Sequence, residues 1–97
     1  MRTRVKICGI TRVEDAVASV RLGADALGFI FWPHSPRYIS PASARSIVQS
    51  VGPLVSTVGV FVNSSATEID EAVRLSGIST LQFHGDESPA FCESFGR

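Results

Sequence analysis

The sequence has no excess of either charge, because nine basic and nine acidic side chains cancel over its 97 residues. Nucleic-acid binding usually requires a basic excess, and an acidic solvating tail requires the opposite imbalance. Long apolar runs are also missing, since the longest ones, such as Ala26–Trp32 and Val58–Val62, are far shorter than a membrane span. We therefore expect neither a nucleic-acid partner nor a membrane-embedded segment.

Cysteine is scarce, and Cys8 and Cys92 lie near opposite ends of the chain. Small secreted domains stabilised by disulfides usually contain more cysteines. The first residues carry charges but no apolar stretch long enough for a signal peptide. We expect free thiols in a cytoplasmic protein. Phosphate loops of the Walker type, G-x-G-x-x-G and zinc-ligand spacings do not occur either, so we expect no cofactor and no metal.

What the sequence does contain is a repeated alternation of β-rich runs and helical stretches in a chain that is 44% hydrophobic. Such alternation is typical of α/β folds built from parallel strands. The second run is apolar on both faces, as expected of a strand buried between two layers. The pattern predicts about four βα units, with strands at Arg4–Cys8, Ala26–Phe31, Leu54–Val62 and Thr80–His84.

Helix start and stop signals separate the predicted strands. Capping boxes are predicted at two places, one from Thr11 to Glu14 and one from Ser65 to Glu68. N-cap serines followed by proline are predicted to begin the other two helices. Gly23, Gly77 and the Gly52-Pro53 pair are suited to end helices. The N-cap pairs are Ser40-Pro41 and Ser88-Pro89, and Asp86 and Glu87 are expected to cap the last helix.

Two parallel architectures fit this pattern, a doubly wound open sheet and a (β/α)8 barrel. A complete barrel typically needs about 250 residues, so length alone favours the open sheet. In both architectures the functional residues follow the carboxyl ends of the strands. The positions in question hold Cys8, the loop Trp32–Tyr38, Asn63 and the segment His84–Glu87.

Cys8 has two interpretations. It is either a small buried hydrophobic residue, as free cysteine often is, or a thiolate that acts as a base or nucleophile. Lys6, two residues earlier on the same face, and the helix beginning after Thr11 both favour the thiolate. Cys92, between two phenylalanines on the last helix, is predicted to belong to the core.

Arg37 and His84 are also open to a structural and a functional interpretation. Arg37 is either a solvated loop charge or a guanidinium that binds a planar carboxylate, beside the rings of Trp32 and Tyr38. His84 is predicted to share a strand face with Gln82, and a polar face on an inner strand must point into a barrel interior or a cleft. Its imidazole either makes a structural hydrogen bond or lines a site.

Five segments taken together resemble phosphoribosylanthranilate isomerases. Each is short, but they occur in order, with family-like spacing, over essentially the whole chain. The resemblance implies the barrel rather than the open sheet. The segments are Lys6–Thr11 (KICGIT), Gly23–Phe31 (GADALGFIF), Ser35–Ile39 (SPRYI), Val58–Asn63 (VGVFVN) and Leu81–Glu87 (LQFHGDE).

The resemblance implies a cofactor-free enzyme of tryptophan biosynthesis that performs an Amadori rearrangement of N-(5-phosphoribosyl)anthranilate. The cysteine of the family's KICG motif is the general base and matches Cys8. The arginine of SPR is associated with the anthranilate carboxylate and matches Arg37, and the histidine of QxHGDE lines the same mouth and matches His84. The family's general acid and phosphate loops come from later strands. Asp25 and Asp86 do not match the position of that acid.

Residues 1–97 are therefore expected to form the N-terminal half of one (β/α)8-barrel domain, truncated and inactive alone. Two alternatives remain open: a non-catalytic half-barrel that self-associates, and another phosphosugar barrel enzyme, such as an indoleglycerol-phosphate synthase relative. The cysteine of KICG argues against the latter. The expected partner is a small-molecule substrate, with a homodimer or a fusion to another tryptophan-pathway enzyme left open.

Overall fold

The computed structural model describes residues 4–95, so the predicted domain boundaries at residues 1 and 97 lie outside the described residues. Strands and helices alternate throughout this part of the chain. None of its helices is long and apolar enough to cross a membrane. The elements are β1 (Lys6–Cys8), α1 (Val13–Arg21), β2 (Ala26–Ile30), α2 (Pro41–Val51), the 3-10 turn η1 (Gly52–Leu54), β3 (Ser56–Phe61), α3 (Ala66–Ser76), β4 (Thr80–Phe83) and α4 (Pro89–Glu93).

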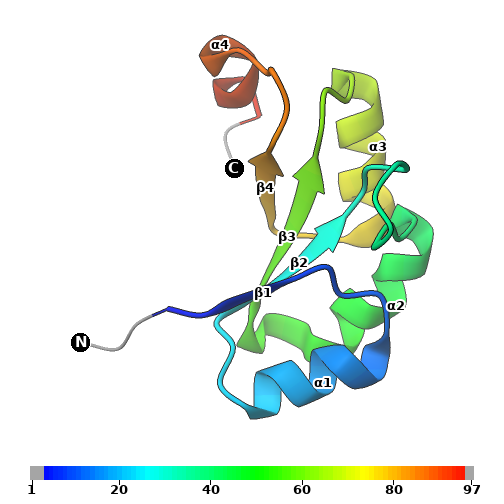
Figure 1. Ribbon diagram of the computed structural model, residues 1–97, viewed down its shortest axis with the longest axis vertical. Helices are drawn as coiled ribbons and strands as arrows, with labels where there is room; N and C mark the ends of the chain where they lie inside the picture. Colours follow the sequence, from blue (N-terminus) through cyan, green and yellow to red (C-terminus); the bar gives the residue numbers. More distant parts are fainter. Residues whose placement is uncertain (1–3, 96–97) are drawn as a thin grey trace.

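The four strands form one parallel sheet in the order β1-β2-β3-β4. A doubly wound sheet reverses its strand order at a switch point and carries helices on both faces. Here the order never reverses, and α1, α2 and α3 lie along one side of the sheet (Figure 1). This is the arrangement of consecutive units in a (β/α)8 barrel, which confirms the predicted fold class.

The sheet face toward the helices carries the main hydrophobic core. Leu27 and Phe29 of β2 are fully buried there, and Phe61 of β3 packs against Phe31 with ring centroids 5.6 Å apart. Each fully buried side chain of this size contributes about 1.5–3 kcal/mol relative to its exposed state. Gly59 of β3 faces the same core, because a Cβ there would overlap the side chain of Ile78.

The opposite face, which we call the inner face, combines aliphatic and polar side chains. Successive residues of a strand point to opposite sides, so the alternation that places Phe29 under the helices places its neighbours here. Three buried aliphatic side chains form the floor of this face, and the outer strands supply the polar groups. Its residues include Lys6, Cys8, Gly28, Ile30, Val58, Val60 and Gln82.

Most of the predicted helix boundaries are confirmed. The Ser40 side chain caps α2, and the Ser65–Glu68 capping box at the start of α3 has both of its hydrogen bonds. The capping box predicted from Thr11 is wrong, because α1 begins at Val13 and its N-cap is Arg12, without a side-chain cap bond. The Glu14 carboxylate pairs instead with the Arg12 guanidinium at 2.6 Å. That pairing occupies the group that a capping box would use.

Strands are shorter than the sequence pattern indicates. The first begins at Lys6 rather than Arg4, and the third begins at Ser56 because the preceding residues form η1. Gly23 follows the end of α1 with φ of 96°, as predicted for a helix stop. These differences are confined to element ends, so they leave the predicted inward and outward alternation of each strand unchanged.

Candidate active site

Cys8 ends β1 with its side chain on the inner face. Its position depends on Gly28 of the neighbouring strand, because a Cβ at residue 28 would lie 2.9 Å from Cys8 Sγ and 3.2 Å from Cys8 Cα. The same Cβ would lie 3.3 Å from Lys6 Cε, so the lysine and the thiol share this face, as predicted. The missing side chain of Gly28 therefore provides the space that the sulfur occupies.

Arg37 is brought to Cys8 by the loop after β2. Ile39 donates its backbone N–H to the Ile30 carbonyl at 3.1 Å, so the loop returns alongside the strand it has just left. Arg37 Nη1 then donates to the Cys8 carbonyl oxygen at 3.3 Å. The guanidinium lies over Gly9, whose φ of 85° and missing Cβ leave room for Arg37 Cδ and Nη1. The structure therefore places Arg37 next to the end of β1.

His84 follows β4 and is connected to the same face through Gln82. The His84 imidazole Nε2 contacts Gln82 Nε2, and Gln82 Oε1 accepts a hydrogen bond from Lys6 Nζ. Leu81 and Phe83, by contrast, pack into the helix-covered core, as the strand alternation predicts. Cys8, Arg37 and His84 thus lie at or just after the carboxyl ends of β1, β2 and β4. Arg37 contacts the Cys8 backbone, and His84 is joined to Lys6 through Gln82.

Glu87 fastens the loop after β4 to the loop after β3. Its carboxylate accepts hydrogen bonds from the backbone N–H groups of Asn63 at 2.6 Å and Gly85 at 2.8 Å. Partial desolvation raises the pKa of Glu87, but these backbone donors and the nearby His84 outweigh it, so its pKa lies below the ordinary value. Glu87 was expected to cap the last helix, but the N-cap is Ser88. Nothing in the local sequence pattern signals this contact between loops.

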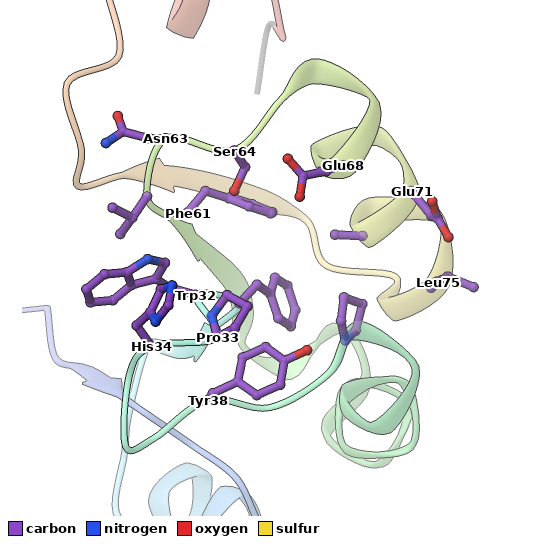
Figure 2. Close-up of a pocket in the computed structure, with 14 residues that line it drawn as sticks. Trp32, Pro33, His34, Tyr38, Phe61, Asn63, Ser64, Glu68, Glu71 and Leu75 are labelled. Carbon is purple, nitrogen blue, oxygen red and sulfur yellow. The ribbon is translucent and has the colours of Figure 1, made fainter.

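A cleft of about 460 Å³ lies between the loop after β2 and helix α3 (Figure 2). Trp32, His34 and Tyr38 form one wall, and Glu68 and Glu71 of α3 belong to the other. The Trp32 and His34 rings meet edge to face with centroids 5.5 Å apart. Cys8, Arg37 and His84 do not line this cleft. The candidate site therefore consists of the groups around Cys8, and the cleft is a separate feature.

Sequence reasoning identified Cys8, Arg37 and His84 but undervalued two of their neighbours. The sequence pattern predicts a positive charge near Cys8 from Lys6 and a polar strand position for Gln82, but it does not predict that the two side chains meet. Their mutual hydrogen bond joins the first and last strands of the sheet, 76 residues apart in the chain. The one available signal was the polar character of alternate positions in β1 and β4. Cys92, predicted to be core, is half-buried on α4.

Sequential parallel βα units with polar side chains gathered at the strand ends define the class of (β/α)8-barrel proteins. Within that class, residues 5–96 match the family model described as "N-(5'phosphoribosyl)anthranilate (PRA) isomerase". A match over almost the entire sequence is decisive. The chain belongs to this family.

Relatives and solved structures agree with this assignment. The N-(5'-phosphoribosyl)anthranilate isomerase of Nitrosospira multiformis is 58% identical over 95 residues, which cover 98% of this chain and 46% of that protein. A phosphoribosyl anthranilate isomerase in complex with reduced 1-(o-carboxyphenylamino)-1-deoxyribulose 5-phosphate matches with TM-score 0.94 and 46% identity, over 98% of this chain and 49% of that one. Monomers generated from the dimeric enzyme of Thermotoga maritima give TM-score 0.91 and 45% identity, over 98% and 48%. The chain spans about half the length of the curated relatives it matches.

Proposed function

We propose that the complete protein to which this chain belongs is a phosphoribosylanthranilate isomerase of tryptophan biosynthesis. In this proposal residues 1–97 are the N-terminal half of a single (β/α)8-barrel domain and are inactive alone. The supporting observation is the family match over residues 5–96, which includes Cys8, Arg37 and His84. The reaction converts N-(5-phosphoribosyl)anthranilate to 1-(2-carboxyphenylamino)-1-deoxyribulose 5-phosphate.

Cys8 is proposed as the general base. After the sugar ring opens to a Schiff base, the thiolate accepts the proton from the sugar C2. The electrons of the broken C–H bond form an enolamine and neutralise the iminium nitrogen, and the enolamine then tautomerises to the ketose. A base within hydrogen-bond reach of the proton is the requirement for this step. The end of β1, with Lys6 on the same face, supplies a thiol at a position where parallel α/β enzymes place such groups.

Arg37 and His84 are proposed to bind the substrate. A guanidinium has a planar fork of donors that matches a carboxylate, and Arg37 lies 3.3 Å from the backbone oxygen of Cys8, next to the proposed base. The anthranilate carboxylate is the group of the substrate that this fork fits. His84, at the end of β4, is proposed to contribute a polar contact to the same mouth.

Replacement of the thiol tests the proposal. Cys8→Ser in the complete protein should lower turnover by roughly 10²–10⁴-fold, the usual contribution of general base catalysis. Cys92→Ser is the matched control, because its thiol belongs to α4, which supplies none of the proposed site residues, and it should retain activity. A Cys8→Ser protein with unchanged turnover of phosphoribosylanthranilate would remove Cys8 from this role.

A second candidate, a non-catalytic half-barrel that associates with a second copy, is favoured by exposed apolar side chains. Leu22 beside α1 and Leu54 in η1 have relative exposures of 89% and 81%. Sedimentation of the 97-residue chain, combined with an isomerase assay, separates a self-associating module from an inactive half-enzyme.

For the complete protein we propose a cytoplasmic location and a homodimer. Fusion to another tryptophan-pathway enzyme is the alternative assembly.

A further inference from the structure

Three polar side chains form a chain of contacts across the inner face. Lys6 of β1 donates from Nζ to Gln82 Oε1 of β4, and Gln82 Nε2 contacts His84 Nε2. The contacts span strands that are at opposite edges of the described sheet. Beneath them lie the buried side chains of Val58 and Val60. Because these side chains lie over an apolar surface, few other hydrogen-bond partners are available to them. Each donor and acceptor can therefore be assigned from its chemistry.

The lysine determines the orientation of the amide. An ammonium group has only donors, so the group of Gln82 that faces Lys6 must be the carbonyl oxygen. The amide NH2 of Gln82 then faces His84, and an amide nitrogen can only donate. The ring atom Nε2 of His84 is therefore the acceptor. In a neutral imidazole with an unprotonated Nε2, the proton resides on Nδ1.

We propose that Lys6 and Gln82 are positioning residues that hold His84 in the Nδ1–H tautomer, so that the imidazole acts as a hydrogen-bond donor to the substrate. The role toward substrate rests on the proposed function; the tautomer does not. Over the part of the chain that the structure describes, no other group hydrogen-bonds to the His84 ring, and its side chain is exposed. Nδ1–H is thus available to an oxygen acceptor, such as a carboxylate or hydroxyl group of a sugar–anthranilate conjugate.

The tautomer can be measured directly by ¹⁵N NMR of the histidine side chains in the complete protein. Spectra are recorded about two pH units above the free-imidazole value of ~6.5, and His84 is assigned by the signals lost in His84→Asn. The expected wild-type result is Nδ1–H. Gln82→Glu retains the acceptor for Lys6 but replaces the donor to His84 by a second acceptor, so the proton should move to Nε2. Gln49→Glu, the same substitution on the exposed side of α2, is the matched control and should leave the tautomer unchanged.

Each result decides the proposal. The proposal would be overturned if His84 of the wild-type protein carried its proton on Nε2. It would also be overturned if His84 kept the Nδ1–H tautomer in the Gln82→Glu protein. If Gln82→Glu does not fold, Gln82→Met replaces it. Loss of the amide donor should also reduce the fraction of His84 in the Nδ1–H tautomer, and an unchanged fraction would overturn the proposal. In the isomerase assay, Gln82→Glu should raise KM about tenfold, as expected for loss of one hydrogen bond to a charged group. Nδ1–H in a protein without isomerase activity would sink the proposed function and leave the tautomer assignment standing.

Discussion

The two faces of the sheet are built from the same strands but serve different ends. The helix-covered face is almost entirely aliphatic and aromatic, and its side chains are fixed by close packing. The inner face carries Lys6, Cys8 and Gln82 over an aliphatic floor. Lys6 and Gln82 are held by a hydrogen bond to each other, and the Cys8 sulfur occupies the space left by Gly28. One difference follows for mutation: a change under the helices should alter stability, whereas a change on the inner face should alter the site.

Two strand glycines test this contrast, because each leaves space that a neighbouring side chain fills. Gly59→Ala on the helix-covered face should have the larger effect on stability. The new Cβ would overlap the Ile78 side chain and lie 3.0 Å from Phe31 Cε2, in a core that cannot expand cheaply. We expect a loss of about 3 kcal/mol in the free energy of unfolding, the upper range for overpacking. Urea denaturation of the complete protein measures it, and an unchanged midpoint would contradict the packing described for β3.

Gly28→Ala on the inner face should act mainly on turnover. Its Cβ would lie 2.9 Å from Cys8 Sγ, so the sulfur must shift. A displacement of about 1 Å at a reacting group can lower the rate on the order of 10²-fold. We expect that loss in kcat with a smaller loss of stability than in Gly59→Ala, measured by steady-state kinetics and urea denaturation on the same samples. If both glycine variants lose stability and retain kcat, the functional distinction between the two faces fails.

Glu87→Gln should give the smallest effect, because the carboxylate joins two loops at the exposed end of the sheet. The two backbone N–H groups bind different carboxylate oxygens, and Gln replaces one of these oxygens by an NH2 donor, so either Asn63 or Gly85 loses its partner. The expected loss at neutral pH is about 1 kcal/mol, reduced by solvent exposure. The folded-state pKa of Glu87 is lowered from its ordinary 4.5. Its contribution is therefore fully present above that value and is lost as the pH falls through the folded pKa.

Urea denaturation as a function of pH checks this prediction. The difference between wild type and Glu87→Gln should be constant near neutrality and shrink below about pH 4.5. Asp86→Asn is the control, because the Asp86 side chain makes no hydrogen bond within the described residues while its backbone N–H bonds Asn63 Oδ1 at 2.7 Å. A difference that grows on acidification would contradict the assigned contacts.

Much of the fold could be predicted because it depends on local signals. Ser65 and Glu68 form both bonds of the predicted capping box, and Gly23 ends α1 as its position indicates. Thr11 failed as a cap because a competing local interaction, Arg12 with Glu14, is equally available to the chain. Strand ends were predicted too long, since β-propensity extends past the last ladder hydrogen bond and the residues before Ser56 form a 3-10 turn.

The candidate site was only partly predictable. The positions of Cys8, Arg37 and His84 at strand ends follow from the alternation of strands and helices, and their roles stay predictions. The contacts that join them do not follow from that pattern. Arg37 reaches the Cys8 carbonyl only because the loop after β2 returns alongside its own strand, and Glu87 binds a loop 24 residues away. Local periodicity contains no information on such pairs.

By itself, the sequence determined the order of the elements, the two faces of each strand and the family, because each of these depends on residue type and spacing along the chain. Tertiary structure alone decided which side chains of different strands and loops come within reach of one another, and therefore which polar groups meet on the inner face. The sequential parallel order places Lys6 and Gln82 on outer strands of one sheet, within reach of each other. A hydrogen bond depends on distance and direction in space, and neither is set until the strands have paired.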